Sequence, residues 1–225
     1  MIPVSYCSRH LRSILHTSYT RPAEEEVKTN NVWLKGHTGE SEIRPALRKS
    51  STIDARWIDF GSITILWSQP VAPLQILSKD GRWRWVKHID NALVSVQSAS
   101  LTSGLLIIHP QVVNAGDALD FLTGGYYKGT IHRVVQPPPD QQQYTRLGVF
   151  YFVMPDDHTK LVPMRESPLL QRVGINPRCE DSVAPTMEEW RKGRTSAYGQ
   201  SDLKHGQEKG VEEEVINGVV VKHWN

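Results

Sequence analysis

The sequence has little cysteine, no long apolar run and almost no net charge, and each shortage excludes a class of protein. Among its 225 residues are only two cysteines, Cys7 and Cys179, which cannot build a disulfide framework and fit a reducing compartment. The longest apolar run, residues 104–110, is far shorter than the ~20 residues of a membrane-spanning helix, so we expect a soluble chain. The first residues lack the charged and apolar regions of a signal peptide, so we expect a cytoplasmic protein.

The charge balance argues against a nucleic-acid-binding protein. Lys and Arg number 26 against 24 Asp and Glu, which leaves a formal net charge of +2 at pH 7. Such a balance implies no extended basic surface. We therefore expect neither a nucleic acid nor a membrane as partner, and we expect a monomer.

What the sequence does contain is a succession of short segments rich in β-branched and aromatic residues. They are residues 62–67, 74–77, 82–86, 129–135 and 147–153. Turn residues separate them, for example Lys79-Asp80-Gly81 between the second and third. Many short strands with turns between them predict a mainly β protein with an antiparallel barrel or jelly roll.

The C-terminal part has a different pattern. Thr186 followed three residues later by Glu189 is a capping box, which predicts a helix running toward Tyr198. Asn217-Gly218 within residues 215–221 predicts the turn of a closing strand or hairpin. We therefore divide the chain into an irregular N-terminal remnant (1–30), a jelly-roll domain (31–165) and a C-terminal extension of helix and strand (166–225).

Three residues of these segments suggest metal chemistry. Asp59 precedes one strand and His132 lies on a later one, and such residues can meet across a small barrel. With a second histidine they would form the 2-His-1-carboxylate triad that binds Fe(II). Arg146, on the next strand, could capture the far carboxylate of a keto acid through two hydrogen bonds. The alternatives are a histidine satisfied within the core, an aspartate that caps a turn and an exposed arginine.

Two longer phrases carry a family resemblance. Residues 124–138 (GGYYKGTIHRVVQPP) and 144–151 (YTRLGVFY) resemble the isopenicillin N synthase-like 2-oxoglutarate/Fe(II)-dependent dioxygenases, particularly the fungal members. The resemblance implies a double-stranded β-helix (jelly roll) and Fe(II) bound by His37, Asp59 and His132. It assigns binding of the co-substrate 2-oxoglutarate to Arg146 and Gly148, although the family usually has Ser where Gly148 stands. With O2 as second co-substrate, such an oxidoreductase hydroxylates, desaturates or cyclises a small organic substrate.

The sequence departs from the family pattern at the first metal ligand. The family has His two residues before the Asp, whereas this chain has Trp57 before Asp59. Residues 34–38 (LKGHT) look like the missing first half of that motif, and removing residues 39–58 would restore it. Removing residues 94–111 similarly joins two halves of a second family phrase.

We hypothesise that both inserts are translated introns, because their ends can be encoded by splice-donor and splice-acceptor consensus sequences. The alternative is two genuine surface insertions. The family also carries a longer helical N-terminal region, so the resemblance makes this chain N-terminally truncated, and we expect marginal stability.

Two other readings of the function stay open. One is a catalytically impaired, mis-spliced or degenerate relative with a broken His-x-Asp motif; the other is a cupin that binds a sugar or metal without redox chemistry. Neither cysteine belongs to a CxxC pair, which argues against zinc. The remaining C-terminal histidines, His205 and His223 among them, are predicted to be surface or turn residues.

Overall fold

The structure is a computed structural model that describes most of the chain from residue 59 onward and two short strands before it. The described residues are 12–19, 36–37, 59–90, 93–96, 111–135, 137–141, 143–144, 146–197 and 203–224, of which 12–19, 36–37, 93–96 and 146–148 are described by their backbone. The predicted insert 39–58, most of the insert 94–111, Trp57 and Cys7 lie outside these residues.

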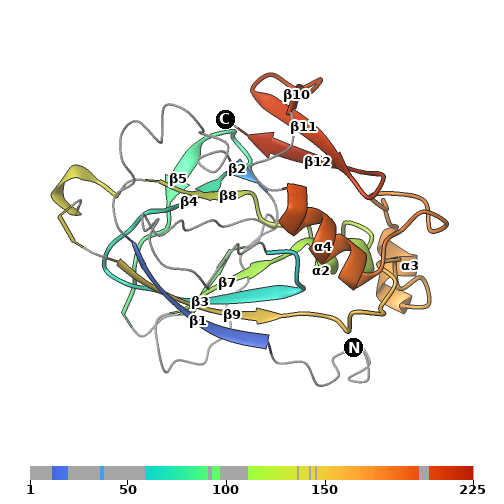
Figure 1. The fold of residues 1–225 in the computed structure, drawn as a ribbon, viewed down its shortest axis with the longest axis horizontal. Coiled ribbons are helices and arrows are strands. Elements are labelled where there is room, and N and C mark those ends of the chain that lie inside the picture. Colours follow the sequence, from blue (N-terminus) through green and yellow to red (C-terminus); the bar gives the residue numbers. More distant parts are fainter. Residues whose placement is uncertain are drawn as a thin grey trace.

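The described chain is mainly β, as predicted, and its strands form two sheets (Figure 1). The five-stranded sheet has the order β1-β9-β3-β7-β6. Its strands are β1 (Arg12–Tyr19), β9 (Arg146–Val153), β3 (Ile63–Trp67), β7 (Gln111–Ala115) and β6 (Leu93–Val96). The seven-stranded sheet has the order β10-β11-β12-β2-β8-β4-β5. Its strands are β10 (Lys204–His205), β11 (Val211–Ile216), β12 (Val219–Trp224), β2 (Gly36–His37), β8 (His132–Val134), β4 (Leu74–Leu77) and β5 (Trp83–Trp85).

The two sheets face each other across an apolar core, which is the arrangement of a jelly roll. Leu66, Phe150 and Phe152 of the five-stranded sheet form one buried cluster, against which Leu74 and Ile76 of the other sheet pack. Strand alternation explains this, because Thr64 and Leu66 are the buried positions of β3 while their neighbours are half-exposed. The predicted double-stranded β-helix core is confirmed.

A few short helices complete the described fold, and the α-helices among them gather at one end of the sheets (Figure 1). They are α2 (Asp117–Leu122), α3 (Pro168–Val173), α4 (Met187–Ala197) and the 3-10 helix Pro139–Gln141. A second core cluster joins α2 and α4 to the β11–β12 hairpin through Phe121, Trp190 and Val219. Phe121 and Trp190 meet edge to face with 5.0 Å between ring centroids. None of these helices has the length and apolar character that crossing a bilayer requires.

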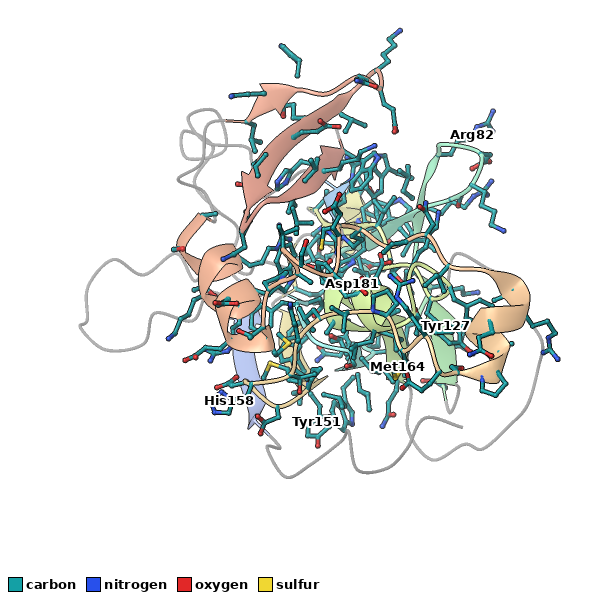
Figure 2. The ribbon with its side chains drawn as sticks, turned by 90° about the vertical axis from the view of Figure 1, so that its right-hand side faces the viewer. Arg82, Tyr127, Tyr151, His158, Met164 and Asp181 are labelled. Carbon is teal, nitrogen blue, oxygen red and sulfur yellow. The ribbon has the colours of Figure 1, made fainter. Side chains whose placement is uncertain are left out.

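Turns and caps lie where the sequence predicted them. Gly81 has φ +72° and donates its backbone N–H to the Ser78 carbonyl at 2.9 Å, closing the β4–β5 turn beside Arg82 (Figure 2). Asn217 and Gly218 both have positive φ, as a two-residue hairpin turn of type I′ requires. Thr186 and Glu189 exchange the two hydrogen bonds of a capping box at the start of α4.

The structure differs from the expected pattern in two strands. The segment 1–30, expected to be irregular, contains β1, which pairs with β9 along most of its length. β6 pairs with β7 in parallel, whereas all other named strand pairs of the described chain are antiparallel. Most of β6 belongs to the predicted insert 94–111, so the parallel pair is an addition at the sheet edge.

Candidate metal centre

Asp59 and His132 meet in the interior between the two sheets. Asp59 lies four residues before β3, and His132 is the first residue of β8, so the two come from opposite sheets. The Nε2 atom of His132 lies 3.6 Å from Oδ2 of Asp59, and the two residues are 4% and 1% exposed. The structure therefore brings together two of the three metal ligands that the sequence predicted.

Two polar side chains hold the Asp59 carboxylate in place. Thr64 donates its hydroxyl to Oδ1 at 2.6 Å, and the Asn114 amide donates to Oδ2 at 2.8 Å. Thr64 and Asn114 stand directly opposite each other on β3 and β7, so both lie on the inner face of the sheet. Sequence reasoning missed both residues, although a polar residue at an inward position of an alternating strand was a signal that could have found them.

The hydrogen bond on the other side of the His132 ring fixes its tautomer. Nδ1 lies 2.8 Å from the backbone carbonyl of Thr130, which can only accept, so Nδ1 carries the proton. In the neutral ring Nε2 then presents a lone pair toward the Asp59 carboxylate, which also presents lone pairs. Two lone pairs that face each other in a buried site suit a bound cation, which both can coordinate. A histidine whose second nitrogen donates to a carbonyl is likewise typical of a metal ligand. These residues therefore fit Fe(II) or another divalent metal.

The backbone of the third predicted ligand, His37, lies beside that of His132 in the sheet. β2 pairs with β8 at one register position, where His37 stands directly opposite His132. Directly opposite positions of an antiparallel pair share one face of the sheet. The backbone therefore puts His37 next to His132, although residues 39–58 separate it from Asp59 in sequence. Among the side chains that the structure describes, no group of three His, Cys, Asp or Glu could hold a metal ion.

The predicted co-substrate residues lie on β9. Arg146 begins this strand and Gly148 follows two residues later. Strand alternation puts positions 146 and 148 on the same face as Phe150, which is buried and lines the cavity between the sheets. The side chain of Arg146 lies outside the described part of the chain.

Asp59 and His132 line a cavity between the two sheets. The cavity is small, with about 20 Å³ of space for the centre of a water molecule. Its lining consists of Asp59, Thr64, Leu66, Leu74, Ile76, Val112, Asn114, Thr130, His132, Val134 and Phe150. The polar groups therefore gather around Asp59 and His132, and the remaining wall is apolar, as is typical of a small-molecule site.

One histidine that the sequence placed at the surface is buried. His223 is 3% exposed, and its Nε2 lies 2.9 Å from Oε1 of the buried Glu214. The prediction was wrong because it overlooked the alternation of β12, in which positions 219, 221 and 223 face inward and positions 220 and 222 are more exposed.

Comparison with known proteins identifies the part of the chain that contains this centre. Residues 55–155 match the 2OG-Fe(II) oxygenase superfamily. This part of the chain is therefore similar to that superfamily. Both Asp59 and His132 lie inside the matched range, and so do Thr64 and Asn114. The family resemblance seen in the sequence is thereby confirmed.

Individual relatives extend the likeness beyond the matched range. A UPF0676 protein from Schizosaccharomyces pombe is 33% identical over 182 residues, which are 76% of this chain and 49% of that protein. A 2-oxoglutarate-dependent dioxygenase from Dothideomycetidae sp. is 31% identical over 105 residues, 46% of this chain and 26% of that enzyme. The chain thus spans about half of the length, or less, of these curated relatives.

Solved structures also resemble this chain. One is a 2OG-Fe(II) oxygenase family protein from Caulobacter crescentus. It is 22% identical, with a TM-score of 0.44, and the match covers 67% of this chain and 42% of that one.

Proposed function

We propose that this chain is an oxidoreductase of the Fe(II)/2-oxoglutarate-dependent dioxygenase type that acts on a small organic substrate. The observation that carries the proposal is the buried pair of Asp59 and His132, with His37 in register beside His132. The match of residues 55–155 to the superfamily supports it, because the superfamily is named for this metal and co-substrate.

Fe(II) would be held by Asp59, His132 and His37. When bound, the metal supplies the redox chemistry with O2 that protein side chains lack. The protein contributes orientation: Thr64 and Asn114 hold the carboxylate of Asp59, and the Thr130 carbonyl holds the imidazole of His132. Holding Asp59 and His132 in advance in this way reduces the side-chain entropy that metal binding would cost.

The remaining residues of the cavity would bind the organic molecules. Arg146 is assigned the distal carboxylate of 2-oxoglutarate, since a guanidinium binds a carboxylate through two parallel hydrogen bonds. Gly148 leaves space there where the family's Ser would offer a hydroxyl. The apolar wall that includes Leu66, Ile76 and Phe150 excludes water from the region next to the metal centre.

The test is Fe(II)-dependent release of succinate from 2-oxoglutarate by the purified chain. We expect succinate in the presence of Fe(II) and O2, and its loss in His132→Ala and Arg146→Ala. Arg82→Ala is the matched control for the arginine, because Arg82 is exposed at the tip of the β4–β5 hairpin and should leave turnover unchanged. Metal binding that survives in Arg146→Ala together with an absence of succinate from the unaltered chain would favour a cupin-like binding protein instead.

A further inference from the structure

A buried group of charged side chains lies outside the cavity, beneath α4. Asp117, Arg194, Glu214 and His223 are each at most 8% exposed. Arg194 bridges two of them, with Nε 3.5 Å from Oδ2 of Asp117 and Nη1 3.8 Å from Oε1 of Glu214. Burying four ionisable groups together is costly unless they pair. Removing one partner leaves the others buried without a counter-charge. The group connects α2, α4 and the β11–β12 hairpin.

One end of this group reaches the metal centre through the backbone. The N–H of Asp117 donates to the carbonyl of Asp59 at 3.1 Å, and the Asp117 carboxylate is held by the indole N–H of Trp190 at 3.2 Å and by Arg178 at 2.9 Å. The position of the Asp59 backbone is therefore set by the same contacts that hold α4.

The other end reaches the metal centre through sheet register. In β12, His223 stands directly opposite His37 of β2, and in β8 His132 stands directly opposite His37 from the other side. β12 pairs with both residues of β2, whereas β8 pairs with His37 alone. Within the described strands, β2 is thus held by more paired residues to β12 than to β8. The pairing with β12 therefore does more to keep His37 beside His132.

The His223 ring is itself held in a defined orientation. A carboxylate only accepts, so His223 Nε2 donates to Oε1 of Glu214 at 2.9 Å. Nδ1 is buried and has no hydrogen-bond partner within the described part of the chain. A buried polar atom without a partner costs about 1–3 kcal/mol, so His223 is an unfavourable residue for a position that only needs to fill the core. Position 219 of the same inner face, by comparison, is a plain Val.

We propose that His223 is a positioning residue of the metal centre, acting through His37. Held by Glu214 and, behind it, Arg194 and Asp117, His223 fixes β12 at the register that sets His37 opposite His132. The insert 39–58 makes this device necessary, because His37 has no short covalent link to Asp59 in this chain. The proposal rests on the proposed function, since it takes His37, Asp59 and His132 as the metal ligands.

A double-mutant cycle on metal affinity tests the proposal. Co(II), which does not oxidise in air as Fe(II) does, is titrated into the full chain carrying His223→Ala, His37→Ala or both. We expect His223→Ala to weaken Co(II) binding about tenfold, the usual effect of removing a supporting partner of a ligand. In the His37→Ala background the same substitution should change affinity less than twofold. Val220→Ala, on the exposed face of the same strand, is the matched control and should leave affinity unchanged.

Two further variants keep the test decisive if His223→Ala fails to fold, which thermal unfolding will show. His223→Gln retains a donor toward Glu214 and should bind Co(II) within about threefold of the unaltered chain. Glu214→Gln weakens the hydrogen bond to His223. It should reduce Co(II) affinity when His37 is present and have little effect in the His37→Ala background. An equal loss in both His37 backgrounds would overturn the proposal, because His223 would then act independently of His37 or ligate the metal itself.

Asp59→Ala and His132→Ala separate this inference from the proposed function. If neither substitution weakens Co(II) binding, the metal centre itself is wrong. If both abolish binding while the effects of His223→Ala and His37→Ala are simply additive, only the positioning role of His223 fails.

Discussion

Both oxygens of Asp59 accept a short hydrogen bond, so the proposed metal centre should depend on residues that would not touch the metal. Thr64→Val removes the 2.6 Å hydrogen bond to Oδ1 with almost no change in shape. We expect about tenfold weaker Co(II) binding, because outer-shell partners of a ligand are typically worth one to two orders of magnitude. Thr195→Val makes the same chemical change on α4, where the hydroxyl only bonds back to the Arg191 carbonyl. Equal Co(II) affinity of the two variants in a titration would contradict this role of Thr64.

Asp120 on α2 makes the stability of the fold depend on pH. Burial raises the pKa of its carboxyl above the ordinary value, although Arg178 and the N–H of Gly129 oppose the shift. The folded chain therefore binds more protons than the unfolded chain between the ordinary and the raised pKa, and stability falls as pH rises through that interval. Asp120→Asn stays neutral and its amide oxygen can still accept the 3.2 Å bond from Gly129. We expect the variant to gain stability relative to the unaltered chain as pH rises above the ordinary pKa of an aspartate, about 4.

Urea unfolding at several pH values measures this effect, and Asp80 supplies the opposite case. Arg84 holds the pKa of the exposed Asp80 carboxyl below its ordinary value. The ionised Asp80 carboxylate therefore stabilises the fold above its ordinary pKa, and this stabilisation is lost as pH falls. Asp80→Asn should therefore lose stability relative to the unaltered chain as pH rises. A gain in both variants would show that Asp120 is not the cause.

At the scale of elements, α4 packs against the C-terminal hairpin, and its start is defined by a capping box. Thr186→Ala removes the hydroxyl that accepts the N–H of Glu189 at 3.2 Å. We expect a loss of about 1 kcal/mol in the free energy of unfolding, as for other N-cap substitutions. Thr195→Ala on the same helix lacks a capping role and should stay within about 0.5 kcal/mol. Denaturant unfolding monitored by Trp fluorescence distinguishes them, and equal losses would mean that the cap is dispensable.

Elements with a local signal were predictable from sequence, and elements set by distant pairing were not. The turn at Gly81, the hairpin at Asn217-Gly218 and the capping box of α4 each require particular residues at particular positions. The parallel pairing of β6, the strand β1 and the burial of His223 depend on which strands become neighbours. That choice is made by tertiary contacts, which no short stretch of sequence encodes.

The candidate site divides along the same line. Asp59 and His132 stand in phrases specific enough to identify, and the structure puts them 3.6 Å apart. Thr64 and Asn114 carry no motif of their own, and their contact with Asp59 follows from their pairing across β3 and β7. His37 was predicted by resemblance, yet its place opposite His132 results from the seven-stranded sheet as a whole.

At the scale of the whole molecule, the decisive question is whether residues 39–58 and 94–111 belong to a working enzyme. Deleting 39–58 joins Thr38 to Asp59, so that His37 stands two residues before Asp59. The Cα atoms of these two residues then cannot lie more than about 7 Å apart. Replacing so long a connection by so short a one lowers the entropic cost of closing the loop by about 2 kcal/mol. We therefore expect Co(II) affinity to rise on the order of tenfold in the deletion variant.

The second deletion and the His223 variant make this prediction specific. Removing 94–111 alone should leave Co(II) affinity unchanged, because neither Asp59 nor His132 loses its neighbour in sequence.

A shorter transcript that lacks the codons of both segments would identify them as retained introns. Equal Co(II) affinity and equal succinate release by the full chain and the double deletion would instead identify them as tolerated surface insertions. If the short link to Asp59 takes over the task of β12, His223→Ala should cost less affinity in the chain lacking 39–58 than in the full chain.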